Sequence, residues 1–198
     1  FMTAKIQIRS VNSVVCTALI TAGADPLLAR LCAARSVETP QELEDKFTGL
    51  LPYQSLKNCE QAAVRLANAI EAGERMLIVA DYDADGATAC AVAVQGLSAM
   101  GARVDYLVPN RFEHGYGLTP EIANLAAAQG AQLLITVDNG IASLAGVARA
   151  PALGIEVIVT DHHWPAGQVP NCIFVDPHQY GCDSVPYTPL STPTIFTG

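Results

Sequence analysis

No lysine follows Lys57 in this 198-residue chain, and only four arginines accompany twelve carboxylates after residue 73. Residues 1–73 carry seven basic and seven acidic side chains, so the net charge of −8 arises entirely in the remainder. Such a balance argues against a nucleic-acid surface built from basic residues alone. Divalent cations held among the carboxylates would invert the local charge and create an anion site. The charge pattern therefore indicates a metal site, and it does not by itself exclude phosphate substrates.

Long apolar runs and closely spaced cysteines are also missing. Apolar stretches such as 133–135 are far too short to cross a bilayer, and the N-terminus shows no secretory signal pattern. The six cysteines are scattered and form no C-x-x-C pair, which argues against a zinc or disulfide framework. We therefore expect a cytoplasmic protein with reduced thiols and no membrane partner. Because 51% of the residues are hydrophobic, the chain can bury a real core.

The first 73 residues have a mostly helical pattern. Thr39 and Glu42 have the spacing of a capping box, and Asp25 and Pro26 are suited to open a helix. This part predicts a small helical appendage without chemistry of its own. Its expected elements are a short strand at 5–9, helices within 13–35 with a break at 23–26, and a helix at 58–72.

After Gly73, short apolar runs alternate with helical stretches. This rhythm predicts an α/β domain over 74–180, with a mostly parallel five-stranded sheet and helices on both faces. Pro151 should distort the last turn of the third helix, and residues 181–198 should form an atypical, extended tail. The expected strands are 76–80, 103–107, 132–136, 155–159 and 172–175, and the expected helices are 84–100, 119–129 and 141–152.

Polar residues gather in four loops that follow the predicted strands. Parallel strands end at one edge of a sheet, so these loops should converge on one cleft. Three crowded acids after the first strand (Asp81, Asp83 and Asp85) repel one another and need a cation. Carboxylates and imidazoles suit Mn²⁺ or Mg²⁺, and carboxylates from several loops can bridge two ions. The four loops are 81–86, 108–118, 137–141 and 160–165.

Each of these residues also has an ordinary structural explanation when it is taken singly. Asp161 could cap a helix, Asp85 before Gly86 is typical of a turn, and paired histidines are most often surface residues. We place His178 in that surface class. The placement of such residues at the ends of consecutive strands favours a shared site.

Three other motifs fit poorly. The acids from Asp81 imitate the start of an EF-hand loop, but its twelfth position is Val92 and a strand precedes it. An aspartyl-phosphate or receiver site uses a downstream lysine, and none follows Lys57. A P-loop requires a Gly-Lys pair, which the chain does not contain.

Together the four loops resemble the DHH phosphoesterase superfamily. They read D-x-D-x-D-G-A-T from Asp81, P-N-R-F-E-x-G-Y-G-L from Pro109, T-V-D-N-G-I from Thr136 and T-D-H-H from Thr160. The second motif resembles one that is particular to the RecJ branch of this superfamily, the single-stranded-DNA-specific 5′→3′ exonucleases. The resemblance runs from about residue 5 to residue 177.

The resemblance implies a two-ion Mn²⁺ or Mg²⁺ centre with Asp138 as the bridging carboxylate. Asp161 would support the histidines, and His163 would face the scissile phosphate as an acid or transition-state stabiliser. The implied reaction is in-line attack of an activated water on DNA, with release of 5′-mononucleotides. The implied metal ligands are Asp81, Asp83, Asp138 and His162.

The loop at 108–118, which carries the RecJ-type motif and is called the RecJ-type loop below, would contact the substrate. Arg111 is the best candidate to hold a phosphate, because its guanidinium can bind two phosphate oxygens. The implied partners are single-stranded DNA and other DNA-repair proteins. The further substrate-binding candidates are Gly115 and Gly117, which would allow close approach of the DNA backbone, and Asn139 and Gly140, as donors to phosphate.

The chain departs from the family pattern after residue 177. The family has another metal-binding aspartate, a linking helix and a second, glycine-rich domain downstream, and residues 184–189 stand where an L-A-G-V-G helix start is expected. Neither Asp176 nor Asp183 has the context of that aspartate. We therefore expect an N-terminal portion of a longer enzyme, or a product ending in unrelated sequence, with a partly formed metal site.

The expected function is that of a divalent-metal-dependent 5′→3′ exonuclease on single-stranded DNA in repair or recombination, present as a catalytic fragment. One alternative is a DHH phosphoesterase for oligonucleotides, cyclic dinucleotides or pyrophosphate, which the Arg111 loop argues against. The other is an inactive binding or scaffold fragment.

Overall fold

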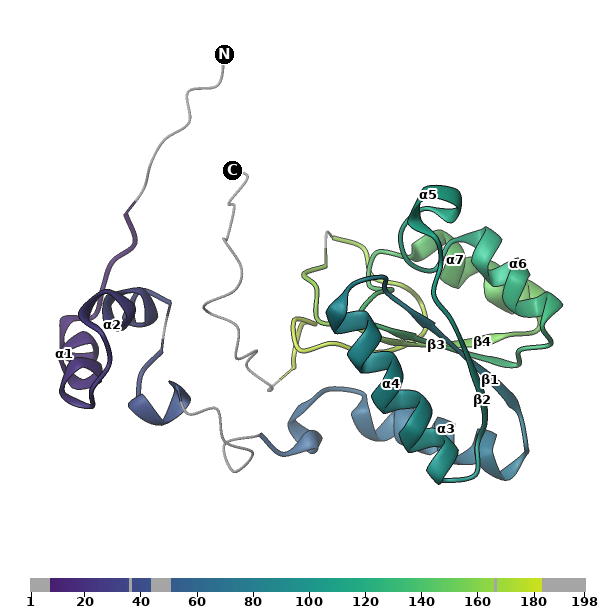
Figure 1. Cartoon of the computed structure of the whole chain (residues 1–198), viewed down its shortest axis with the longest axis horizontal. Coiled ribbons are helices and arrows are strands. Elements are labelled where there is room, and N and C mark those ends of the chain that lie inside the picture. Colours follow the sequence, from purple (N-terminus) through teal and green to yellow (C-terminus); the bar gives the residue numbers. More distant parts are fainter. Residues whose placement is uncertain (1–7, 36, 44–50, 166, 183–198) are drawn as a thin grey trace, which may run out of the picture. The chain divides into compact units, whose positions relative to one another are not determined.

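The computed structural model describes residues 8–35, 37–43, 51–165 and 167–182, which belong to two compact units (Figure 1). The larger unit is Pro52–Val185. The expected strand at 5–9 falls largely outside the described residues, as does the expected tail from residue 183 onward. Within the described ranges, no helix has both the length and the apolar character needed to cross a membrane.

The smaller unit contains two short α-helices and a 3₁₀ turn. They are α1 (Ser13–Thr21), α2 (Pro26–Ala33) and η1 (Pro40–Leu43). As predicted, Asp25 caps α2 by accepting hydrogen bonds from the backbone of its first turn, and Pro26 opens the helix. Its small core consists of Leu19, Ala29, Cys32 and Val37.

The larger unit is built on a five-stranded parallel sheet, which confirms the predicted α/β class. The strands are β1 (Arg75–Ala80), β2 (Arg103–Leu107), β3 (Leu133–Val137), β4 (Glu156–Thr160) and β5 (Ile173–Val175). Their order in the sheet is β2-β1-β3-β4-β5. The order in which the chain adds strands therefore reverses between β1 and β3, and ligands bind at such a switch point in open α/β sheets.

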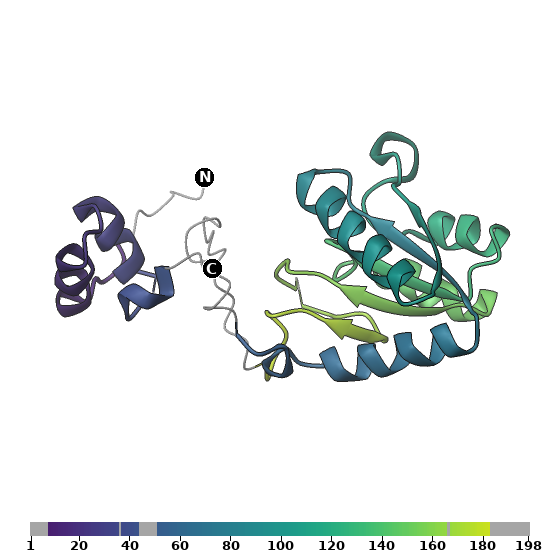
Figure 2. The ribbon, with the colours of Figure 1, turned by 60° about the horizontal axis from the view of Figure 1, so that its bottom comes forward.

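Helices cover both faces of the sheet. One face packs against α3 (Cys59–Glu71) and α4 (Ala84–Ala99), and the other against α6 (Pro120–Ala128) and α7 (Leu144–Arg149) (Figures 1 and 2). Alternate residues of β1 enter the two cores, since Met76 and Ile78 join the first and Leu77 and Val79 the second. A strand buried on both faces must be apolar throughout, as residues 76–80 of β1 are.

Three short helical turns complete this unit. They are η3 (Tyr53–Ser55), α5 (Arg111–His114) and η4 (Ala150–Leu153). The third helix of the domain was expected at 141–152, but α7 begins only at Leu144 and passes at residue 150 into the 3₁₀ turn that contains Pro151. Residues 141–143 instead form a turn, in which the Ser143 amide donates to the Gly140 carbonyl at 2.9 Å.

The compact unit begins at Pro52, whereas the sequence placed the start of the catalytic domain at residue 74. The reason is that the apolar face of α3 packs on the sheet. Two polar contacts join α3 to distant strands: the Asn58 side chain donates to the Phe174 carbonyl at 2.9 Å, and Arg65 pairs with Glu156 at 2.6 Å. The predicted helix at 58–72 therefore belongs to the core of the larger unit.

Candidate metal centre

The site lies at the carboxyl ends of β1, β3 and β4, beside the switch point between β1 and β3. Asp81 and Asp83 follow β1, Asp138 follows β3, and residues 161–163 follow β4. The parallel register brings these ends to the same edge, since Ala80 pairs with Val137 and Val137 with Thr160. The convergence expected of the loops after β1, β3 and β4 is thus observed.

The loop after β1 turns at once into α4. Asp81 is buried, and Asp83 is exposed and caps α4 by accepting hydrogen bonds from the Asp85 and Gly86 amides, each at 3.1 Å. A side chain at Gly86 would collide with the Asp81 carbonyl oxygen. Glycine at this position therefore lets the first turn of α4 lie directly against the backbone of Asp81, while Asp85 remains exposed at the turn.

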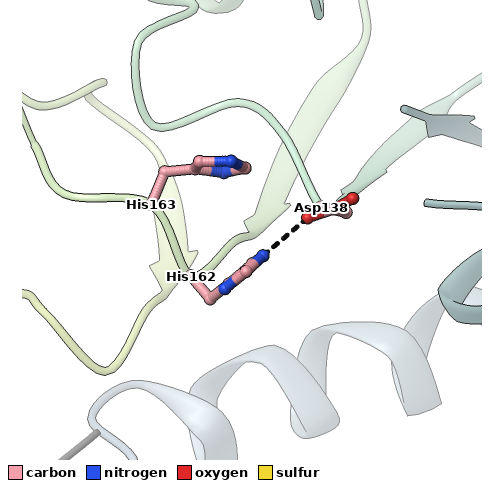
Figure 3. Close-up of side chains that lie close together, drawn as sticks. All are labelled: Asp138, His162 and His163. Carbon is pink, nitrogen blue, oxygen red and sulfur yellow. Dashed lines mark hydrogen bonds and ion pairs between the residues drawn. The ribbon is translucent and has the colours of Figure 1, made fainter. Parts of the chain in front are cut away.

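Asp138 has an unusual backbone and a buried carboxylate. Its φ of 61° lies in the left-handed region, which is uncommon for residues other than glycine. One carboxylate oxygen, Oδ1, is 2.8 Å from Nε2 of His162, and the other, Oδ2, is buried without a hydrogen-bond partner among the described residues (Figure 3). Burial and the neighbouring Asp83 raise the pKa of Asp138, and His162 opposes this rise.

Asp161 is not a helix cap and organises the loop after β4. Its Oδ1 accepts hydrogen bonds from the His162 amide at 2.7 Å and from Nδ1 of His163 at 2.7 Å, and its Oδ2 accepts one from the Ile141 amide at 2.9 Å. The side chain therefore fixes the orientation of His163 and joins the loops after β3 and β4. Burial lowers the pKa of His163, but the hydrogen bond and charge of Asp161 outweigh it and the net pKa is raised.

The arrangement fits a pair of divalent cations. Two groups of possible ligands, one with Asp81 and Asp83 and the other with His162 and His163, share Asp138, and in each group the ligand atoms lie within 4.8 Å of one another. The buried Oδ2 of Asp138, which has no hydrogen-bond partner in the described structure, would be available to bind a cation. Carboxylate and imidazole donors match the preferences of Mn²⁺ and Mg²⁺.

Tyr116 belongs to this site although the sequence did not single it out. Burial raises its pKa far above the ordinary tyrosine value, and the nearby charges of Asp81, Asp161 and Asp138 add to the effect, as does a hydrogen bond to Asp81. The phenol therefore stays protonated and can donate to a carboxylate or phosphate oxygen. Its position inside the RecJ-type motif, between Gly115 and Gly117, was the sequence signal that could have identified Tyr116 as a site residue.

The other candidate residues of that loop differ in their surroundings. Arg111 begins α5, the short helix between β2 and α6, where the sequence predicted only a loop. Gly115 is exposed and has a φ of 75°, in the range that favours glycine. Gly117 is buried, and a side chain there would press on the Ser143 hydroxyl. The close approach at Gly117 is therefore to another loop of the protein.

Asn139 and Gly140 also lie inside the protein. The Asn139 side chain is fully buried, and its amide donates to the carbonyls of Val79 at 3.0 Å and Val137 at 2.9 Å. Both donors are thus used by backbone oxygens at the ends of β1 and β3, and this geometry does not support the predicted hydrogen bond to phosphate. A side chain at Gly140, where φ is 117°, would meet the Thr136 hydroxyl and Val159.

A second polar cluster lies behind the site, after β5. The prediction that His178 is a surface residue is wrong, because its side chain is only 4% exposed and its ring stacks on Trp164 with centroids 4.0 Å apart. Its backbone amide donates to Oδ1 of Asp176 at 2.6 Å, and Asp176 is fully buried. Burial raises the pKa of Asp176 and lowers that of His178. No periodic pattern in the sequence indicates this pair, since the contact depends on tertiary packing.

Comparison with known proteins places the site in a family context. A family model described as the DHH family, N-terminal domain, matches residues 75–197. The single-stranded-DNA-specific exonuclease RecJ of Salmonella typhimurium is 50% identical over 169 residues, which cover 84% of this chain and 29% of that protein. The Escherichia coli protein of the same name is 48% identical over 184 residues, which cover 92% and 32%. The chain thus spans about a third or less of these relatives.

Two solved structures are also similar. A crystal structure of exonuclease RecJ bound to manganese has a TM-score of 0.61 at 40% identity, covering 66% of this chain and 33% of that chain. A crystal structure of RecJ from Thermus thermophilus in complex with Mn²⁺ has a TM-score of 0.61 at 31% identity, covering 86% and 24%. Both structures hold manganese, a cation that the donor set of this site suits.

Proposed function

The chain belongs to the DHH family, and from this premise we propose that it forms the metal-dependent catalytic centre of a 5′→3′ exonuclease for single-stranded DNA. The observation that carries the proposal is the position of Asp138, which is shared by two ligand groups at the switch point of the sheet. A carboxylate shared in this way is the arrangement needed for two ions that act together on one phosphodiester. The relatives named for single-stranded DNA and the structures that contain manganese support the substrate and the metal.

The proposed ligands are Asp81, Asp83, Asp138 and His162. Bound divalent cations would neutralise the charge of the phosphate and activate the attacking water. Because Asp161 holds Nδ1 of His163, the other ring nitrogen is directed away from Asp161 and can face the substrate. The raised pKa of His163 favours its protonated form, which suits a proton donor to the leaving oxygen or a stabiliser of developing negative charge.

Arg111 and Tyr116 are the proposed phosphate contacts. Arg111 begins the short helix after β2, and Tyr116 forms a hydrogen bond with Asp81 of the metal centre. A guanidinium that binds two oxygens together with a protonated phenol would orient the terminal phosphate. Asn139 and Gly140 would instead position the loop that carries Asp138, and Gly115 would allow the strand to approach.

The activity is tested with a long single strand carrying a label at its 5′ end or at its 3′ end, in the presence of Mn²⁺. Degradation from the 5′ end releases the 5′ label at once as a mononucleotide, whereas the 3′ label stays on shortening strands. His163→Ala should reduce the rate by about 10²–10⁴-fold if it transfers a proton. The control is Asn124→Ala, since Asn124 is exposed on α6 and lies outside the four loops and both ligand groups.

Two results would contradict the proposal. Rapid hydrolysis of dinucleotides or pyrophosphate together with resistance of long single strands would assign the chain to another DHH activity. Mn²⁺ binding without hydrolysis of any phosphodiester would assign it to a binding role. The wider proposal, action in DNA repair or recombination together with other repair proteins in the cytoplasm, follows from this substrate.

A further inference from the structure

Trp164 is the single tryptophan of the chain and directly follows His163. Its side chain is exposed, with 65% of the residue's surface accessible to solvent. Tryptophan has a large apolar surface that proteins usually bury at least in part. An exposed indole beside a candidate metal centre is therefore a surface available for a flat ligand.

The indole of Trp164 packs against a buried histidine ring. The ring of His178 lies against it with centroids 4.0 Å apart and planes inclined at 45°. His178 is itself fixed, since its side chain is 4% exposed and its backbone amide is bonded to the fully buried Asp176. Trp164 is thus supported by a buried ring while most of its surface remains open.

Trp164 is also close to the proposed chemistry. It lies two residues after the proposed metal ligand His162, so their Cα atoms can be no more than about 8 Å apart. The intervening His163 is anchored to Asp161, and the ring of His163 lies 4.7 Å from that of His162. A nucleotide whose phosphate is held at the centre would therefore have its base within reach of the indole.

We propose that Trp164, supported by His178, is a stacking platform for a nucleobase next to the scissile phosphate. This inference rests on the proposed function and adds the part of the substrate that the residues of the metal centre do not recognise. Every base has an aromatic face, so such a platform binds single strands with little sequence preference. A base within a duplex is already stacked on both sides, so the platform favours an unpaired terminus.

Because no other tryptophan is present, the intrinsic tryptophan fluorescence of the whole chain reports on this position alone. The probe is a 5′-phosphorylated oligothymidylate with phosphorothioate linkages, which resists hydrolysis, titrated in the presence of Mn²⁺. A matched probe lacks the two bases at its 5′ end. Stacking predicts that the first probe quenches the fluorescence and that the second does so weakly.

Labelled probes give the affinity for the wild type, Trp164→Ala and Trp164→Phe. We expect Trp164→Ala to weaken binding of the full probe by roughly 5- to 150-fold, and Trp164→Phe to retain most of the affinity because phenylalanine also stacks. Removing the two bases should weaken binding to the wild type by a similar factor and weaken binding to Trp164→Ala little. The reason is that removal of the bases and removal of the indole abolish the same contact. Unchanged Mn²⁺ affinity of both variants shows that the loop is intact.

Equal affinity of the wild type and Trp164→Ala for the full probe would overturn the proposal. An equal loss on base removal in both proteins would also overturn it, because the bases would then be bound elsewhere. Failure of the proposed function gives a different result: the wild type would bind neither probe and would leave labelled single strands intact. The stacking proposal would then be refuted as well.

Discussion

At the scale of single residues, the site depends on side chains that bond to backbone atoms of neighbouring loops. The gathering of Asp81, Asp83, Asp138, His162 and His163 at one edge of the sheet could be predicted, because each follows an apolar strand. The roles of Asn139 and His178 could not be predicted, since each depends on tertiary contacts, whereas the motif around Tyr116 offered a signal. Asn139 is the clearest case, because its amide joins the ends of β1 and β3 across 60 positions of the chain.

Replacement of Asn139 by alanine should weaken both the fold and the metal centre. The change removes the side-chain donor to the buried carbonyls of Val79 and Val137, of which Val137 still accepts from the Asp81 amide at 3.3 Å. Each lost buried hydrogen bond costs roughly 0.5–1.5 kcal/mol. Urea denaturation should show this loss, and calorimetric titration should show weaker Mn²⁺ binding. In the control, Asn124→Ala, only an exposed contact to Arg149 is lost, and we expect a change within about 0.5 kcal/mol. An unchanged Mn²⁺ affinity of Asn139→Ala would contradict the positioning role.

Asp176→Asn should stabilise the protein at neutral pH. The folded state raises the pKa of this buried carboxyl, so its ionisation opposes folding increasingly as pH rises above the ordinary aspartate value of about 3.9. Asparagine can still accept the hydrogen bond from the His178 amide through its side-chain oxygen, and it carries no charge. We expect a gain of about 1 kcal/mol or more in free energy of unfolding at pH 8 in EDTA, which disappears near pH 4.

Thermal denaturation at several pH values measures this gain. The control is Asp105→Asn, whose carboxylate is exposed on β2 and should change stability little. A loss of stability at pH 8 in Asp176→Asn would show that the charge of Asp176 is favourable in the folded protein.

At the scale of helices and strands, the apolar runs predicted each of the five strands of the sheet to within one residue at each end. Parallel strands buried on both faces are apolar throughout, so their limits are marked by the first polar residue. Boundaries that depend on tertiary contacts were harder to predict. The start of α7 is delayed by the turn that begins at Gly140. Helix α3 joins the larger unit through an apolar face whose partner the sequence alone did not identify.

Two glycine substitutions in α4 should have opposite effects. Gly86→Ala would force the start of α4 away from the Asp81 carbonyl, and overpacking of this kind costs about 1–3 kcal/mol. Gly96→Ala lies in the same helix where no described atom is within 4 Å of the added carbon, so it should stabilise by up to about 1 kcal/mol. Denaturant unfolding measures both effects. If the two variants had the same stability, the close approach at Gly86 would be refuted.

At the scale of the whole molecule, the chain combines a small helical unit with a larger α/β unit that carries the site. The class of the fold and the edge of the sheet that bears the chemistry were predictable, because four polar loops follow parallel strands. The sharing of Asp138 between two groups was implied by the family resemblance, and the spatial grouping of ligand atoms supports it. The central claim is that this larger unit holds two cations through one carboxylate.

Calorimetric titration of Mn²⁺ into the metal-free chain tests this claim most directly. We predict two Mn²⁺ ions per wild-type chain, loss of both high-affinity sites in Asp138→Ala, and loss of one in Asp83→Ala. The exposed Asp85→Ala, two positions beyond Asp83 and outside both ligand groups, should retain two. Retention of two tight Mn²⁺ ions by Asp138→Ala would contradict the account.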